Sequence, residues 1–287
     1  MACDWLLIDG SSLIFRAFYG VPAAGARAPD GRPVNAVRGC LDSLARLIAQ
    51  RRPRHIAMAS DEDWRPGWRV ALIPEYKAHR VAEPVPPELI PQMPVIHELL
   101  DALGVDVRGL AGYEAEDVIA TWTALAPGSI EVWSGDRDLF ALVEDPRVVV
   151  LYPERGGLAT VDEAEITRRY GIPGRSYADF AVLRGDPSDG LPGVRGVGDR
   201  TAAELVRRHG GLDAMLGEAR FSDADRDYLR RARLVVRPVL DLPLTLPPGR
   251  RDRYPADTAR FTALTRDHGM VSPGSRLVAA LATLAEA

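Results

Sequence analysis

Acidic residues stand at the ends of short apolar runs in the first half of the sequence. Asp9 closes the run DWLLID, Asp61 closes HIAMASD, and Asp136 closes SIEVWSGD, with Asp138 two residues later. If these runs are parallel β-strands, their carboxyl ends meet at one edge of a sheet, which is where α/β proteins bind ligands. We therefore expect these four aspartates to lie together.

Two further groups of acids extend this set to nine. Glu114, Glu116 and Asp117 open a predicted helix whose N-terminus faces the same edge, and Asp186 and Asp189 lie in the motif GDPSD. Any one group alone is more often a turn or a helix cap. Together, so many carboxylates would repel one another, and burial would raise the cost. Mg²⁺ or Mn²⁺ would remove that repulsion, and two such ions suit in-line phosphoryl displacement.

The glycine-spaced turn GVRGVG follows the last acids. Its glycines let the backbone approach a phosphate, while Arg195 and Arg200 flank the predicted start of a helix at Asp199. The residue order matches neither a P-loop nor a dinucleotide-binding turn. A glycine cap that merely joins two core helices is the alternative.

Composition and charge narrow the class of protein. The chain has 287 residues, two cysteines and a net charge of −4, which becomes positive when the nine acids are set aside. A mildly basic body around an acidic, metal-filled pocket suits a polyanionic substrate. Two cysteines cannot form a disulfide framework or a zinc site, and no apolar run approaches the ~18–20 residues that span a bilayer. We expect a cytoplasmic protein without a membrane partner.

Alternating strand and helix patterns up to about residue 160 predict an α/β unit with a mostly parallel sheet. We expect strands at 4–9, 55–61, 105–110, 129–136 and 147–153, helices at 35–52, 95–103 and 113–125, and then helices at 177–183, 199–209 and 222–236. Ser176 and Asp179 resemble a capping box for 177–183. The proline-rich segment 64–94 has no clean periodicity, which is typical of functional or mobile segments.

Five motifs carry a family resemblance. LLIDGSSLIFRAF, PEYKAHR, GYEAEDVIA, GDRDLFALV and GDPSDGLPGVRGVGDRTA occur in the order and approximate spacing of the bacterial 5′-3′ exonuclease and flap endonuclease family, which includes the N-terminal nuclease domain of DNA polymerase I. The similarity covers roughly residues 4–240. It implies a PIN-like catalytic core over 1–170 with a helical arch at about 64–94. Residues 171–287 would form a helix-hairpin-helix DNA-binding region and C-terminal helices.

The resemblance also implies an activity. We expect a stand-alone, structure-specific 5′→3′ exonuclease and flap endonuclease that hydrolyses DNA near 5′ single-strand/duplex junctions by a two-metal-ion mechanism, in primer removal and repair. The expected ions are Mg²⁺ or Mn²⁺, with K⁺ as a further candidate at the helix-hairpin-helix. The expected partners are DNA with a 5′ flap or 5′ end and a separate DNA polymerase. The protein would be a monomer associated with the bacterial nucleoid.

Motif position assigns the site residues. The implied metal ligands are Asp9, Asp61, Glu114, Glu116, Asp117, Asp136, Asp138, Asp186 and Asp189, and the implied DNA-binding residues are Arg195, Gly196, Gly198, Arg200 and Thr201. Lys77 and Arg80 would neutralise the scissile phosphate at the base of the arch. Asp63 is the alternative to Asp61, because the segment after this strand is one residue longer than the usual family spacing.

Two rival functions remain open at this level. A PIN-type ribonuclease would share the acids at the strand ends but would need neither the hairpin nor the long arch. A DNA-structure-binding module would keep the hairpin while its acids were inert. Cleavage assays on RNA and on a DNA 5′ flap separate these alternatives.

Overall fold

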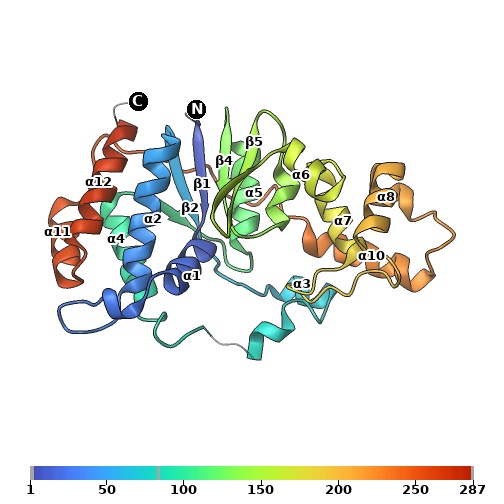
Figure 1. Ribbon diagram of the computed structural model, residues 1–287, viewed down its shortest axis with the longest axis horizontal. Coiled ribbons are helices and arrows are strands. Elements are labelled where there is room, and N and C mark those ends of the chain that lie inside the picture. Colours follow the sequence, from blue (N-terminus) through green and yellow to red (C-terminus); the bar gives the residue numbers. More distant parts are fainter. Residues whose placement is uncertain (1–2, 83–84, 286–287) are drawn as a thin grey trace.

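The computed structural model describes residues 3–82 and 85–285 and contains, within them, a six-stranded sheet with helices on both faces (Figure 1). The strands are β1 (Trp5–Asp9), β2 (His55–Ala59), β3 (Asp106–Arg108), β4 (Ile130–Trp133), β5 (Val148–Glu154) and β6 (Gly157–Val161), in the order β3-β2-β1-β4-β5-β6. Strands β1 to β5 are parallel, and β6 is antiparallel to β5. The predicted mostly parallel α/β class is confirmed, although the sequence analysis assigned no strand to β6.

The sheet lies between two apolar layers, and strand β1 contributes side chains to both. Leu7 belongs to one buried cluster, while Leu6 and Ile8 belong to the other, because successive side chains of a strand point to opposite faces. The first layer is formed by α5 (Ala115–Leu125), α6 (Glu163–Tyr170), α7 (Tyr177–Arg184), α8 (Asp199–His209), α9 (Leu212–Met215) and α10 (Asp223–Val236). The second is formed by α1 (Gly10–Gly20), α2 (Asn35–Arg51), α4 (Gln92–Leu103), α11 (Thr258–Asp267) and α12 (Val271–Ala285).

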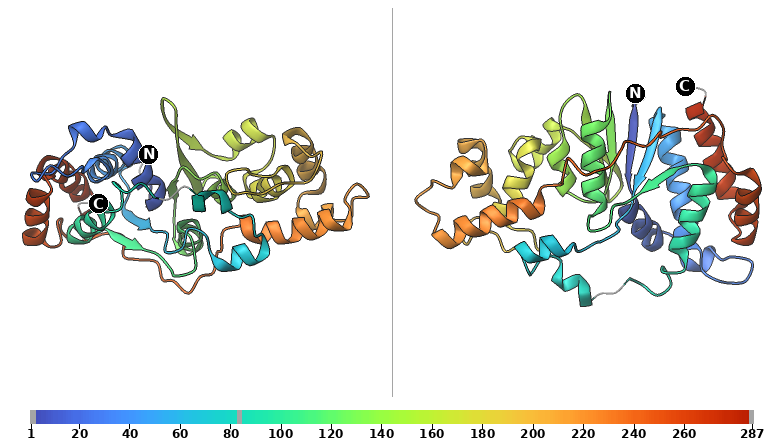
Figure 2. Two further views of the ribbon diagram at one scale, coloured as in Figure 1. Left: turned by 90° about the horizontal axis from the view of Figure 1, so that it is seen from below. Right: turned by 180° about the vertical axis from the view of Figure 1, so that it is seen from behind.

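The carboxyl edge of the sheet is closed by short turns. At Gly10 a Cβ would lie 2.5 Å from the carbonyl oxygen of Ala59, so the connection from β1 into α1 requires glycine. Helix α3 (Gly67–Leu72) and the 3-10 helices Ala78–Ala82 and Asp138–Leu142 lie at this edge, and Figure 2 shows α3 beside α10. The expected arch segment is therefore partly helical, and part of that segment, residues 83–84, lies outside the described residues.

The last two helices pack far from the hairpin region in the structure. Helix α12 packs against α2, and α11 packs against α4, on the opposite side of the sheet from α7 and α8 (Figure 1). Residues 171–287, where we expect the hairpin region and the C-terminal helices, therefore lie in two parts of the fold. The first part carries the hairpin, and residues 258–285 extend the layer that covers the core.

Two local predictions were wrong. Ser176 makes no side-chain cap bond, and Asp179 instead accepts hydrogen bonds from Leu212 N at 2.9 Å and Arg237 Nη2 at 2.8 Å. The Asp179 carboxylate thus binds residues that are distant in the sequence instead of forming a local capping box with Ser176. The helical spacing of Val118, Ile119, Trp122 and Leu125 predicts that all four lie on the apolar face of α5. Leu125 is instead exposed at the end of that helix. Within the described residues, no helix is long and apolar enough to cross a membrane.

Candidate active site

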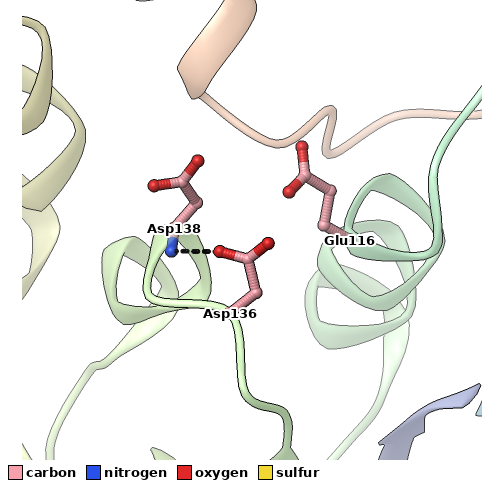
Figure 3. A group of neighbouring side chains, drawn as sticks. All are labelled: Glu116, Asp136 and Asp138. Atoms are coloured by element: carbon pink, nitrogen blue, oxygen red, sulfur yellow. Dashed lines mark hydrogen bonds between the residues drawn. The ribbon is translucent and has the colours of Figure 1, made fainter. Parts of the chain in front are cut away.

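Three carboxylates form the centre of the acidic cluster. Oxygens of Glu116, Asp136 and Asp138 all lie within 4.8 Å of one another (Figure 3). Glu116 comes from the first turn of α5, while Asp136 and Asp138 come from the loop after β4, where the Asp138 N–H donates to Asp136 Oδ1 at 2.9 Å. Burial, followed by the charges of Asp136 and Asp189, raises the pKa of Asp138 well above its usual range. The three oxygens fit a hard divalent cation, which would offset this repulsion.

Asp9 borders this centre at the end of β1. Its carboxylate caps α1, accepting from Ser12 N at 3.0 Å and Ser12 Oγ at 2.7 Å, and it also accepts from Ser134 Oγ at 2.5 Å. Burial and then the nearby charge of Asp61 raise the pKa of Asp9 to about 6. The two serines, which the sequence analysis did not assign a role, hold this carboxylate in place.

Asp61 and Asp63 have different surroundings. Asp61 Oδ1 accepts a hydrogen bond from Ala115 N at 2.6 Å, so this side chain lies at the N-terminus of α5. Asp63 Oδ1 accepts from Arg65 N at 3.1 Å within its own turn. The structure thus places Asp61 beside the helix that carries Glu116.

A buried arginine organises the N-terminal turn of α5. Arg69 is fully buried, and its guanidinium contacts Glu114 at 2.5 Å, Glu116 at 2.8 Å and Asp117 at 2.8 Å, while its Nε donates to Val235 O at 2.9 Å. The hydrogen bond from Arg69 to Val235 also ties α3 to α10. Arg69 is not among the predicted site residues, since nothing in the local sequence indicates that this arginine is buried.

Asp117 makes contacts that differ from those of Glu116. One of its oxygens accepts from Arg69 and from Val239 N at 2.9 Å, and the other accepts from Arg69 and from Glu114 N at 3.2 Å. Asp117 is also completely buried. These contacts occupy both oxygens, so Asp117 anchors the start of α5.

Lys77 is buried rather than free. Its ammonium pairs with Glu114, whose Oε2 also accepts from Tyr76 Oη at 2.6 Å. Although burial opposes its charged form, the carboxylates of Asp189 and Glu114 raise the pKa of Lys77 above its usual range. Its backbone has a φ of 48° and donates to Asp189 O at 3.0 Å. This contact fixes the base of the expected arch against the GDPSD turn.

The GDPSD turn supplies the last two acids. Asp186 Oδ1 accepts from Ser188 Oγ at 2.5 Å, and its Oδ2 accepts from Arg137 and Arg184, each at 3.3 Å. Asp189, which is buried, accepts from Arg80 Nη2 at 3.3 Å. One open pocket is lined by the acids and basic residues Arg80, Asp136, Arg137, Asp138, Asp186 and Asp189. The structure therefore brings these two acids next to Asp136 and Asp138.

The glycine turn leads from α7 into α8. Gly193 has a φ of 70°, and its N–H donates to Tyr228 Oη at 3.0 Å, which anchors the turn to α10. Gly196 has a φ of 77°, and Gly198 is the N-cap of α8. Arg195 and both of these glycines are exposed. A Cβ at Gly198 would touch nothing among the described residues and its φ is −98°, so neither their packing nor the backbone conformation demands glycine there.

The family comparisons agree with this architecture. Residues 4–171 match the model described as "5′-3′ exonuclease, N-terminal resolvase-like domain", and residues 172–242 match "5′-3′ exonuclease, C-terminal SAM fold". A 5′-3′ exonuclease of Streptomyces coelicolor is 48% identical over 96% of this chain and 99% of its own length. One of Mycobacterium tuberculosis is 47% identical over 99% of both chains. The chain belongs to the 5′-3′ exonuclease family, as the sequence motifs predicted.

Relatives of different length and solved structures extend the comparison. DNA polymerase I of Mycobacterium bovis is 39% identical over 92% of this chain, which matches only 29% of that polymerase. The phage T5 D15 flap endonuclease, solved in complex with DNA and metal ions, has a TM-score of 0.68, 15% identity and coverage of 99% of both chains. Flap endonuclease-1 from Methanococcus jannaschii has a TM-score of 0.62, 17% identity, and coverage of 98% of this chain and 93% of its own. At these identities the solved structures establish the shared fold.

Proposed function

We propose that this member of the 5′-3′ exonuclease family is a structure-specific 5′→3′ exonuclease and flap endonuclease that hydrolyses DNA near 5′ single-strand/duplex junctions. The observation that carries the proposal is the cluster of Glu116, Asp136 and Asp138, built from two separate stretches of chain. The GDPSD turn, whose acids line one pocket with Asp136 and Asp138, leads on into the glycine hairpin, and a Cβ at Gly198 there would meet no atom of the described residues. A metal centre and a backbone grip for duplex DNA are the two parts that this activity needs.

We propose that the acids hold two divalent ions, for which Mg²⁺ and Mn²⁺ are the candidates, and the cluster of Glu116, Asp136 and Asp138 supports at least one of them. Asp136 and Asp138, with Asp186 and Asp189, would hold one ion. Asp9, Asp61 and Glu116 would hold or orient the other, with Asp61 favoured over Asp63 because it lies beside α5. Such ions stabilise the negative charge that develops on a phosphoryl group during its transfer.

Glu114 and Asp117 are better suited to positioning than to ligation. Glu114 already pairs with Lys77 and Arg69, and Asp117 has both oxygens bound to Arg69 and backbone amides. Through Arg69, they set the position of Glu116. Both oxygens of Asp186 also accept hydrogen bonds, but Asp186 lines the open pocket and therefore stays in the proposed ligand set. We therefore revise the expected set of nine metal ligands to seven, and we assign Glu114 and Asp117 to positioning those ligands.

The chain's own cations and amides would hold the substrate. Arg80 lines the acidic pocket, while the Lys77 ammonium is directed to Glu114 and stays charged because of its acidic neighbours. Both would neutralise the phosphate next to the cleaved bond. Arg195 and Arg200 are exposed at the hairpin, where backbone N–H groups at the start of α8 can donate hydrogen bonds to a phosphate of the duplex. Gly196, Gly198 and Thr201 belong to the same proposed contact, which would not read base sequence.

Cleavage of matched substrates tests this function. Labelled single-stranded RNA, single-stranded DNA and a DNA 5′ flap are incubated with the protein and Mg²⁺, then with Mn²⁺, and then with EDTA. We expect metal-dependent cleavage of the flap near its junction and of recessed 5′ ends, with slow cleavage of unstructured RNA. A preference for unstructured RNA would favour a PIN-type ribonuclease. Tight flap binding with no cleavage in either metal would favour a binding module.

The product of the proposed cleavage suggests a separate DNA polymerase as the partner of this nuclease. Removal of a 5′ strand leaves a gap or a nick, which a separate DNA polymerase would fill or approach, and we propose that the nuclease acts as a monomer beside it. Light scattering of the protein with and without a flap substrate checks the stoichiometry. A mass of one chain per substrate supports the proposal, whereas two chains per junction would contradict it.

A further inference from the structure

Trp64 is an exposed tryptophan in a chain that otherwise covers this residue type. Its exposed fraction is 42%, whereas Trp5, Trp122 and Trp133 are buried and Trp68 is half-buried. Among the described residues, Trp64 takes part in no aromatic pair, and its indole N–H donates no hydrogen bond, unlike that of Trp68. Leaving a large aromatic surface in water forgoes the stabilisation that burial would give. About two fifths of the Trp64 surface therefore stays open to a ligand.

Both sequence neighbours of Trp64 are hydrogen-bonded to segments at the carboxyl edge of the sheet, Asp63 through its backbone and Arg65 through its side chain. Asp63 N donates a hydrogen bond to Tyr113 O at 3.3 Å, directly before Glu114. Arg65 Nε donates to Tyr76 O at 2.6 Å, directly before Lys77. These contacts place Trp64 between the segments that supply the acidic cluster and the base of the arch. The indole is thus held at a defined position beside the site without being buried by it.

Arg65 adds rigidity to this position. Its Nη2 also donates to Pro74 O at 2.8 Å, so one guanidinium ties the turn to two points of the segment that follows α3. Pro66, which is buried, comes next and is the N-cap of α3. A tryptophan whose neighbours are already ordered loses little further backbone entropy when a ligand contacts it.

An unpaired nucleobase is the ligand that matches such a side chain. Every base has a flat π face, and stacking on an aromatic side chain is favourable whatever the base sequence. Bases inside a duplex already stack on their neighbours, so they offer no free face. We propose that Trp64 is a stacking platform for an unpaired base of the 5′ single strand next to the junction. This role rests on the proposed flap endonuclease function and names a residue that positions its substrate.

The first test compares Trp64→Ala and Trp64→Phe with wild type on a 5′-flap substrate. We expect Trp64→Ala to raise KM roughly 10-fold or more with little change in kcat, and Trp64→Phe to restore most of the loss, because a phenyl ring still stacks. Leu125→Ala is the matched control, since Leu125 is also half-exposed but lies at the far end of α5. This control should leave both constants unchanged.

The second test identifies the base by removing it. An abasic residue is moved along the flap one nucleotide at a time, and kcat/KM is measured for wild type and Trp64→Ala. At the contacted position, wild type should lose about the same factor as Trp64→Ala loses on an intact flap, and the variant should lose nothing more. Binding of the intact flap should also quench tryptophan fluorescence in wild type but not in Trp64→Phe.

The outcomes distinguish this inference from the proposed function. If wild type cleaves flaps but Trp64→Ala has the wild-type KM, Trp64 is not a stacking platform. The abasic residue and Trp64→Ala each lower kcat/KM by some factor. If, at every flap position, the variant on the abasic flap loses the product of these two factors, Trp64 does not contact a base. Failure of wild type itself to cleave any flap would instead overturn the proposed function.

Discussion

Removing one charge from the acidic cluster should stabilise the metal-free protein. Asp138 lies within 4.8 Å of Asp136 and Glu116, and at that separation two unit charges in a medium of effective dielectric constant about 20 repel by about 3 kcal/mol. Within the described residues the Asp138 side chain accepts no hydrogen bond, so Asp138→Asn breaks none. Above the raised pKa of Asp138, where its carboxylate is charged and Arg69 and Lys77 offset only part of the repulsion, we expect a gain of about 1–3 kcal/mol in the free energy of unfolding. Below that pKa the carboxyl group is protonated, so the gain should disappear.

The assay for this prediction is thermal unfolding with and without metal. In EDTA, Asp138→Asn should unfold several degrees above wild type, since about 1 kcal/mol shifts the Tm of a protein of this size by about 2–4 °C. In Mg²⁺ or Mn²⁺, wild type should gain more than the variant, because it binds the ion more tightly. Asp252→Asn, at an exposed position next to Arg251, which pairs with Asp106 at the start of β3, is the control and should change neither value. A Tm of Asp138→Asn at or below wild type in EDTA would refute the reasoning.

Further variants test the other parts of the site. Arg69→Met should destabilise the fold by about 3–5 kcal/mol, as measured by urea unfolding, because it leaves buried carboxylates unpaired; a loss below 1 kcal/mol would contradict the role of Arg69. Arg195→Ala should weaken duplex binding equally for all sequences and lower the slope of log K against log salt by about 1, and an unchanged slope would exclude a phosphate contact. Gly198→Ala should cost under about 1 kcal/mol of stability yet weaken DNA binding, whereas unchanged affinity would mean that the backbone there does not approach DNA. Lys77→Met should lower kcat/KM by roughly 100-fold or more in the flap assay, and near-normal cleavage would remove Lys77 from the mechanism.

The sequence predicted the sheet well where strands are buried on both faces. Strands such as β1 are continuous apolar runs closed by an acid, so both the strand and its functional end are visible in the sequence. Strand β6 was missed because Gly157 begins it and most of its residues are not buried. Helices α11 and α12 were also missed, and their docking on α4 and α2 is a long-range contact that no local pattern reveals.

The candidate site was predictable as a list of acids but not as a division of roles. The spacing of Glu114, Glu116 and Asp117 shows that they share the first turn of α5, yet it cannot show which of them faces a cation from elsewhere in the chain. That division depends on Arg69, which lies 48 residues before Asp117 in the sequence. The same holds for Asp179, whose partner Arg237 comes from beyond α10. Local spacing identifies the carboxylates, and tertiary contacts decide which of them stay free.

The location of bound ions tests the central claim most directly. Crystals of the protein would be soaked in Mn²⁺, and the anomalous signal of manganese would be mapped for wild type and for Asp136→Asn. We expect manganese peaks among Glu116, Asp136 and Asp138 in wild type, and loss or weakening of at least one peak in the variant, together with loss of flap cleavage. Well-ordered crystals with these carboxylates in place but no manganese among them would contradict the account.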